Sequence, residues 1–185
     1  YFLTASVNGL LLHDRKSWKI IDTLTTQAVN TANFSYDSKY IVAGGNDGIV
    51  RVFQVSNGAF INALELHEKR LIYTDISRDN GTIISADFYG NVNVWNTQTQ
   101  DTIRHFKVGK GLKTVQLHPD GRTLVAGNKQ NLRLWRTETG KKITDFSGLI
   151  DNWQTKYINA VKFSLDSQRI ISVGDKALRL WGEIS

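Results

Sequence analysis

One stretch decides the fold: residues 118–135, HPDGRTLVAGNKQNLRLW. It opens with His118-Pro119-Asp120-Gly121, which predicts a tight turn because proline presets φ and glycine accepts a positive φ. An apolar run follows at residues 124–127, and after a polar break residues 132–135 alternate apolar and polar side chains, as in a half-buried strand. The stretch therefore predicts a turn, a strand, a second short turn, and a strand that ends on a large aromatic residue, Trp135.

Other stretches of the chain repeat this pattern. Full copies lie at residues 33–53, 75–95 and 162–181, and a partial copy covers residues 2–13. The residues that end the last strand of each copy, called slot residues below, are spaced 40, 42, 40 and 46 apart: His13, Phe53, Trp95, Trp135 and Trp181. A repeat in the forties with about four strands per copy is the signature of the blades of a β-propeller.

The copies resemble WD40 repeats over essentially the whole chain. The best matches are residues 44–48, GGNDG, with 50–53, VRVF, and the turn of residues 118–121 with its strand 132–135. The resemblance implies a hydrogen-bonded network of His, Ser or Thr, Trp and Asp in each blade. Only Leu66-His67 is a candidate for the family's Gly-His pair, and no slot aromatic is followed by aspartate. We therefore expect this network to be incomplete in every blade.

The repeats predict an all-β protein made of consecutive four-stranded antiparallel blades. Three blades would be complete and two partial, with these bounds: 1–24 (partial), 25–64, 65–106, 107–146 and 147–185 (partial). Closed propellers hold about 4–8 blades, so we expect these residues to be a segment of a larger propeller. A self-contained ring of four or five blades is the alternative.

The composition agrees with a single globular domain. The chain has 185 residues, of which 41% are hydrophobic, and its net charge is +6. It has no cysteine, which excludes disulfides and thiolate metal sites and favours an intracellular protein, cytoplasmic or nuclear. An apolar run of 18 residues and a signal-peptide pattern are both absent, so the sequence indicates neither a membrane span nor secretion.

The candidates for catalysis all have simpler structural explanations. The four histidines follow no metal-binding spacing: His13, His67, His105 and His118. Four aspartates occupy one equivalent hairpin turn, where a carboxylate accepts backbone N–H groups: Asp37, Asp79, Asp120 and Asp166. The glycines of residues 44–48 precede no helix and so predict no phosphate loop. We expect no enzyme activity, no metal and no cofactor.

The resemblance implies binding through one rim of the propeller, made by the loop before each blade and the turn between its second and third strands. Carried over by position, the candidates for partner binding are Arg70, Ile72, Phe88, Lys113 and Tyr157, with Trp153 in an insertion before the last blade. Phe88 is the most informative, because an exposed aromatic beside an arginine has the chemistry of an interface hot spot. The alternative is that Phe88 folds onto its own blade. We expect few large side chains on the opposite rim.

Basic residues gather in the loops of the same rim: Lys110, Lys113, Lys129, Lys156 and Lys176. They could form a solvated face, meet an acidic protein partner, or bind nucleic acid or phosphate. The sequence therefore predicts a non-catalytic scaffold or adaptor that binds protein partners within a multi-subunit complex. A nucleic-acid-binding propeller and the docking domain of a larger enzyme remain as alternatives.

Overall fold

The computed structural model describes residues 1–65, 67–128, 131–146, 158–164, 166–174 and 178–182. These residues form 18 strands in five antiparallel sheets. The first two sheets contain β1 (Phe2–Ser6), β2 (Gly9–His13) and β3 (Ile20–Thr25), then β4 (Val29–Phe34), β5 (Tyr40–Gly45), β6 (Ile49–Gln54) and β7 (Phe60–Glu65). The third sheet contains β8 (Leu71–Ile76), β9 (Thr82–Asp87), β10 (Asn91–Asn96) and β11 (Thr102–Lys107). The last two contain β12 (Thr114–Leu117), β13 (Thr123–Gly127), β14 (Leu132–Arg136) and β15 (Lys142–Asp145), then β16 (Ile158–Phe163), β17 (Ile170–Gly174) and β18 (Leu178–Trp181).

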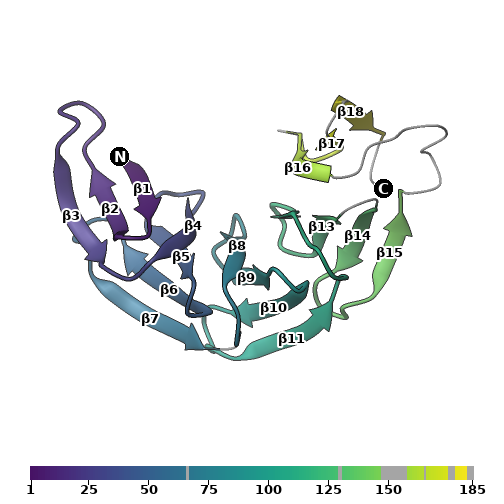
Figure 1. Ribbon diagram of the computed structural model, residues 1–185, viewed down its shortest axis with the longest axis horizontal. Helices are drawn as coiled ribbons and strands as arrows, with labels where there is room; N and C mark the ends of the chain where they lie inside the picture. Colours follow the sequence, from purple (N-terminus) through teal and green to yellow (C-terminus); the bar gives the residue numbers. More distant parts are fainter. Residues whose placement is uncertain (66, 129–130, 147–157, 165, 175–177, 183–185) are drawn as a thin grey trace.

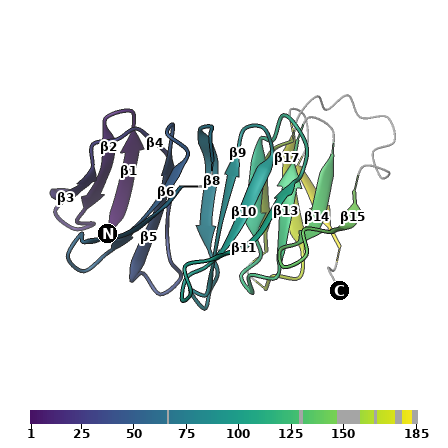
Figure 2. The ribbon, with the colours of Figure 1, turned by 90° about the horizontal axis from the view of Figure 1, so that it is seen from below.

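The five sheets stand side by side along an open arc (Figure 1). Their first strands line the concave side and contact one another from sheet to sheet, while β3, β7, β11 and β15 lie on the convex side. Seen from below, the sheets follow one another as separate blades (Figure 2). The predicted all-β fold of propeller blades, three with four strands and two with three, is confirmed.

The slot residues occupy equivalent places in successive sheets, as predicted. Each one pairs with an aliphatic residue near the start of the preceding strand: Phe53 with Ile41, Trp95 with Ile83, Trp135 with Leu124, and Trp181 with Ile170. In the first sheet His13 pairs with Phe2, and the two rings stack at 4.5 Å. The sequence period therefore reports a true structural repeat.

The hydrophobic core is divided into four clusters, one between each pair of neighbouring sheets. Successive residues of the middle strands point to opposite faces of their sheet, so Ile83 packs toward the second sheet and Ile84 toward the fourth. Both side chains are at most 3% exposed. The middle strands are therefore apolar on both faces, and each sheet is held mainly by its two neighbours.

Glycines hold the turn between the second and third strands against the loop that leads into the next sheet. Gly48 and Gly90 have φ angles of +79° and +82°. A Cβ atom at Gly48 would lie 2.0 Å from the backbone oxygen of His67, and one at Gly90 would lie 2.0 Å from that of Gly109. Only glycine fits this close approach and this left-handed conformation. These contacts fix the rim on which partner binding is predicted.

Candidate partner-binding face

The loop face is the rim formed by the loops between sheets and by the turns between the second and third strands of the four-stranded sheets. Its best-defined feature is an aromatic and cationic group on the third sheet. Arg70 lies over the Phe88 ring, with its guanidinium carbon 5.2 Å from the ring centroid, and Tyr89 meets the same ring edge-on at 5.8 Å. Phe88 is 36% exposed and Tyr89 46%. Phe88 therefore projects from the β9–β10 turn rather than folding into its own blade.

Beside this group the surface is hollowed. A shallow hollow of ≈ 360 Å³ is lined by Tyr89 together with polar and charged side chains, namely His67, Glu68, Lys69, Asp87, Asn91, His105 and Lys107. The lysines stand on the rim, whereas His67 and Asp87 are buried. The arrangement places the aromatic ring of Tyr89 next to polar groups of mixed charge.

A buried hydrogen-bond network supports the β9–β10 turn from below. The Nε2 atom of His67 lies 2.8 Å from the Ser85 hydroxyl and 2.8 Å from the Asn93 side-chain nitrogen, and Nδ1 of His105 lies 2.6 Å from the Asn93 side-chain oxygen. Asp87 accepts hydrogen bonds from the backbone and side-chain nitrogens of Asn91 at 2.9 and 2.6 Å. The turn that presents Phe88 is thereby held in one conformation.

The protonation of His67 follows from its surroundings. Burial lowers its pKa below the usual value, while the carboxylate of Asp87, 3.7 Å from Nδ1, acts in the opposite direction and is outweighed. A neutral ring accepts the Asn93 amide hydrogen at Nε2, which places the ring proton on Nδ1, facing Asp87. The imidazole thus acts as a structural bridge between two strands and a turn.

This network is the one that the resemblance implied, in altered form. The histidine, serine and aspartate positions are filled by His67, Ser85 and Asp87, but Trp95 contributes no hydrogen bond to it. Instead, the hydrogen bond to His67 comes from Asn93, which pairs with Ser85 across strands β9 and β10. The prediction of an incomplete network is confirmed for this sheet. The role of Asp87 was not predicted from the sequence.

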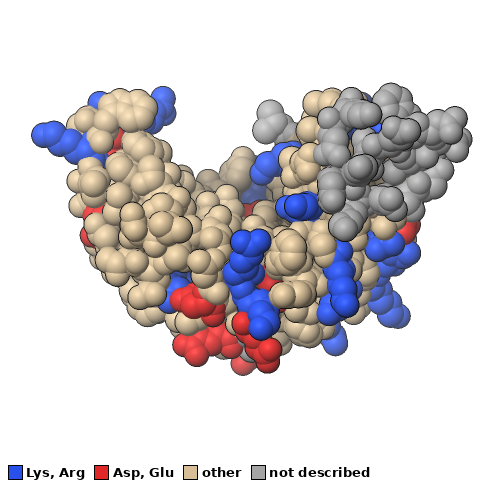
Figure 3. Space-filling model, viewed as in Figure 1, with Lys and Arg blue, Asp and Glu red and all other residues tan. Residues whose placement is uncertain are grey.

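The remaining predicted residues are spread along the face. Ile72 is half-buried and packs against the cluster between the third and fourth sheets, and Lys113 is exposed in the loop before β12, near Lys110. The other predicted residues lie outside the described part of the chain: Trp153, Tyr157, Lys129, Lys156 and Lys176. Figure 3 shows Lys and Arg side chains gathered over the middle of the arc and acidic side chains along its convex edge.

The opposite rim, called the turn face, contains the aspartate turns between the first and second strands. The carboxylates accept backbone N–H groups two residues later, as predicted: Lys39 to Asp37 at 3.1 Å, Gly81 to Asp79 at 2.9 Å, Arg122 to Asp120 at 2.8 Å and Gln168 to Asp166 at 3.0 Å. The Ser35 hydroxyl also donates to Asp37 at 2.7 Å and lowers the pKa of that carboxyl to about 2. These aspartates are structural.

The expectation that the turn face carries few large side chains is wrong. Tyr36 is 66% exposed there, and the guanidinium carbon of Arg78 lies 4.2 Å from its ring centroid. Trp18 is 73% exposed in the turn between β2 and β3, which corresponds to the turn between the third and fourth strands of the four-stranded sheets because β2 carries the slot residue His13. The prediction was based on the short length of these turns. A short turn can nevertheless expose a large side chain, as Tyr36 and Trp18 do.

Chemistry at a metal is not indicated. Within residues 1–65, 67–128 and the other described ranges, no group of three or more His, Cys, Asp and Glu side chains is placed to hold a metal ion. No helix in the described part of the chain is long and apolar enough to span a membrane. The loop face carries exposed aromatic and basic side chains on a turn that buried hydrogen bonds hold in place.

Comparison with known proteins agrees with this architecture. The family model described as "WD domain, G-beta repeat" (WD40) matches residues 18–54 and 146–182. These two segments are similar to WD40 repeats, and together they cover less than half of the chain. The first matched segment contains β3, the outer strand of one sheet, and β4, β5 and β6 of the next. A repeat of the sequence is therefore offset by one strand from a blade of the structure.

Several curated proteins are similar to the chain. Eukaryotic translation initiation factor 3 subunit I of Kluyveromyces lactis is 25% identical over 135 residues, which cover 72% of this chain and 39% of that protein. Human apoptotic protease-activating factor 1 is 24% identical over 173 residues, covering 87% and 13%. Serine-threonine kinase receptor-associated protein of Gallus gallus is 26% identical over 138 residues, covering 71% and 39%. The chain thus spans about two fifths or less of these relatives.

Proposed function

We propose that this chain is a non-catalytic WD40 scaffold segment, part of a larger propeller, that binds protein partners through its loop face within a multi-subunit complex. The observation that carries the proposal is the exposed group of Arg70, Phe88 and Tyr89 on a turn fixed by the His67 network. Aromatic and arginine side chains dominate binding energy at protein interfaces, and a preorganised turn lowers the cost of binding.

The names of the relatives support association as the activity. One is a subunit of a translation initiation factor, another is a receptor-associated protein, and a third is p21-activated protein kinase-interacting protein 1-like. The exposed side chains of Arg70, Lys110 and Lys113 on the loop face favour a partner with acidic side chains. The lack of cysteine favours an intracellular location for the complex.

The turn face supplies a matched control for the experiment. Phe88 with Arg70 on one rim and Tyr36 with Arg78 on the other are both exposed aromatic rings covered by a guanidinium. The tagged chain and its variants Phe88→Ala and Tyr36→Ala would be used to capture partners from a lysate of the source cells, with quantitative mass spectrometry of the captured proteins.

We expect Phe88→Ala to reduce the recovery of specific partners about tenfold or more, since burying such a ring contributes about 1.5–3 kcal/mol. Tyr36→Ala should leave the recovery of those partners unchanged. Partners retained by Phe88→Ala and lost by Tyr36→Ala would show that the wrong face has been chosen. Part of the wild-type recovery should fall as salt is raised, because the lysines act by screened electrostatics.

A further inference from the structure

Three asparagine–glycine pairs occur in the chain, and they differ in their surroundings: Asn8-Gly9, Asn57-Gly58 and Asn80-Gly81. Such pairs favour tight turns, but they are also the sequence in which an asparagine most readily loses its side-chain amide. The backbone nitrogen of the glycine attacks the side-chain carbonyl carbon of the asparagine, and the absence of a Cβ on glycine leaves the approach open. The folded structure decides which of the three pairs is free to react.

The reaction makes three demands on the structure. The side chain of the asparagine must be able to turn toward the nitrogen that attacks it, because the rate depends on how the two groups are aligned. The attacking nitrogen must give up any hydrogen bond that its N–H donates within the fold. The side-chain oxygen becomes negatively charged in the transition state, so a donor that faces this oxygen lowers the barrier.

The pair Asn57-Gly58 meets these demands. It lies in the turn between β6 and β7, on the turn face, where Asn57 is exposed. The backbone N–H of Ala59 donates to the Asn57 side-chain oxygen at 3.1 Å, which supplies a donor to the atom that becomes charged. Among the described residues the Asn57 side-chain nitrogen has no hydrogen-bond partner, so no other side chain holds the amide in place.

The attacking nitrogen of Gly58 is also less engaged than its counterparts. In the equivalent turn of three other sheets this backbone N–H donates to the backbone oxygen four residues earlier: Trp18 to Asp14 at 2.9 Å, Gln100 to Asn96 at 3.0 Å and Gly140 to Arg136 at 2.9 Å. Within the described part of the chain Gly58 forms no hydrogen bond of comparable length and angle to Gln54. Less stabilisation is therefore lost when the Gly58 N–H leaves its place in the turn.

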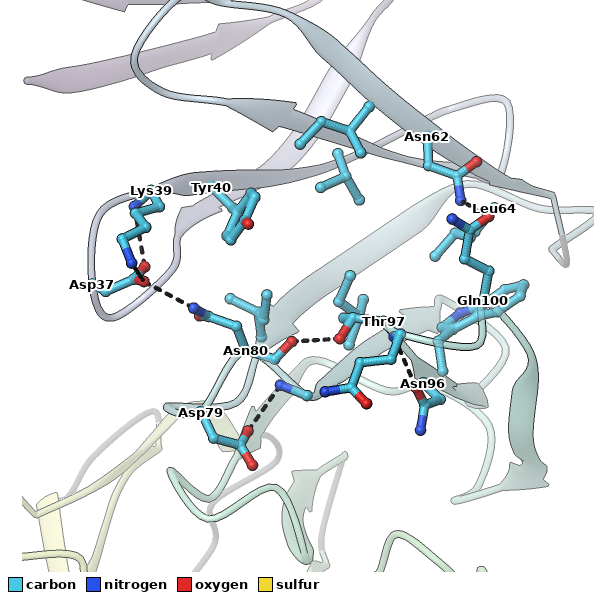
Figure 4. Close-up of a pocket in the computed structure, with 17 residues that line it drawn as sticks. Asp37, Lys39, Tyr40, Asn62, Leu64, Asp79, Asn80, Asn96, Thr97 and Gln100 are labelled. Atoms are coloured by element: carbon cyan, nitrogen blue, oxygen red, sulfur yellow. Dashed lines mark hydrogen bonds and ion pairs between the residues drawn. The ribbon is translucent and has the colours of Figure 1, made fainter.

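The pair Asn80-Gly81 is held on both sides (Figure 4). The side-chain nitrogen of Asn80 donates to Asp37 of the neighbouring sheet at 2.9 Å, and the backbone N–H of Gly81 donates to Asp79 at 2.9 Å. The hydroxyl of Thr97 donates to the backbone oxygen of Asn80 at 2.6 Å. The side-chain oxygen of Asn80 is buried and has no donor among the described residues. Reaction at this pair would break hydrogen bonds to two carboxylates and create an unstabilised negative charge.

The pair Asn8-Gly9 is restrained in a different way. Asn8 is exposed in the turn between β1 and β2, but Gly9 is buried as the first residue of β2 and pairs with Ser6 across the sheet. A Cβ at Gly9 would lie 2.0 Å from the backbone oxygen of Thr25, so this glycine is closely packed. Ring closure on the Gly9 nitrogen would pull the start of β2 out of its ladder.

A carboxylate at residue 57 would stand close to a charge of the same sign. The side chain of Asp22, on β3 of the first sheet, lies against Gly58: a Cβ on this glycine would be 1.9 Å from a carboxylate oxygen of Asp22. Asp22 has no ion pair within the part of the chain that the structure describes. No cation therefore offsets a second negative charge at this contact between the first and second sheets.

We propose that Asn57 is the deamidation site of the folded chain and that its conversion weakens the contact between the first and second sheets. The Gly58 nitrogen bonds to the side-chain carbon of Asn57, and its proton passes to the amide nitrogen, which leaves as ammonia. Water then opens the resulting succinimide ring. Opening at the side-chain carbonyl gives aspartate, and opening at the main-chain carbonyl gives isoaspartate. Each route consumes one water, releases one ammonia and adds one negative charge.

The site is tested by ageing the chain at neutral pH and body temperature, with tandem mass spectrometry of tryptic digests over time. Trypsin cleaves after lysine and arginine, so the three pairs fall on separate peptides, residues 1–15, 52–69 and 79–104. We expect Asn57 to deamidate at least about tenfold faster than Asn80, because the Asn80 pair must first give up its hydrogen bonds to two carboxylates. In a strong denaturant the three rates should become similar.

Equal or faster deamidation at Asn80 or Asn8 in the folded chain would overturn the assignment of the site. The same result would follow if the denatured chain kept the ratio of rates of the folded chain, since the sequence rather than the structure would then set the rates. Peptides of the aged chain should contain isoaspartate at residue 57 as well as aspartate. Unmodified Asn57 in a chain that has deamidated elsewhere would also contradict the assignment.

The effect on the contact between sheets is tested with Asn57→Asp, which imitates one product. We expect this variant to lower the urea midpoint in the wild-type background but not in Asp22→Asn, where the neighbouring charge is absent. The difference between the two backgrounds should shrink at high salt. An equal loss of stability in both backgrounds, or no loss in either, would overturn the role given to Asp22.

Discussion

Replacing Gly90 with alanine should destabilise the third sheet and disturb the turn that presents Phe88. The left-handed φ of +82° costs an L-residue about 1–2 kcal/mol. The new Cβ would lie 2.0 Å from the backbone oxygen of Gly109, so the turn or the adjoining loop must move. Such overpacking costs about 1–3 kcal/mol. The two costs together predict a loss of about 2–5 kcal/mol in the free energy of unfolding.

The assay is urea and thermal unfolding followed by circular dichroism. For a chain of this size the loss corresponds to a fall in Tm of about 4–20 °C. The control is Gly81→Ala, where a Cβ would meet its nearest atom, in the side chain of Asp79, at 3.3 Å. That variant should stay within about 1 kcal/mol of the wild type. If Gly90→Ala unfolds like the control, the close packing of this turn on the next loop has been misjudged.

Three further outcomes are expected. Tyr73→Phe should lower the free energy of unfolding, measured in urea, by about 1–3 kcal/mol. The Tyr73 hydroxyl donates to the largely buried Asp75 at 2.5 Å, and its removal leaves that carboxyl without this hydrogen bond. An unchanged urea midpoint would contradict this prediction. The pKa of His67 is lowered from 6.5, so the unfolded chain takes up this proton first and stability should fall as pH drops below 6.5. His67→Gln should have a shallower pH dependence between pH 7.5 and 5.5, and an identical slope would refute the assignment. Ser35→Ala should raise the pKa of Asp37 from about 2 toward 3.8 in a carboxyl titration by NMR. Because a depressed carboxyl pKa contributes stability that is lost as pH falls through it, the variant should also be less stable above pH 4, with no such change if the serine is irrelevant.

The repeat period was enough to predict the blades, because register in a sheet is set by alternating apolar positions and by turns. Phe53 and Trp95 fall at equivalent places for this reason, although their side chains differ. For Phe88 the sequence left two possibilities, an exposed side chain or one folded onto its own blade, and the structure has the exposed one. The positions of the slot residues depend on local pattern, which a single sequence contains.

Contacts between neighbouring sheets were harder to foresee. The pairing of Tyr36 with Arg78 joins two turns that are 42 residues apart, and neither turn is unusual by itself. The difference between Leu64 and its equivalent in the next copy, Phe106, is visible when the repeats are aligned. What this difference does depends on the residue packed opposite in the neighbouring sheet, which a single sequence does not show.

The offset between repeat and blade has a practical consequence for dissecting the molecule. A fragment that stops after Gln54, where the first family match ends, loses β7 and leaves β6 as a bare edge. Exposed edges recruit other strands, so such a fragment should aggregate. Cutting after Glu65 instead keeps the outer strand on its sheet. Fragments that end where a sequence repeat ends should therefore be insoluble, because that border lies inside a sheet. Fragments that end one strand later, at the border between two sheets, should be soluble.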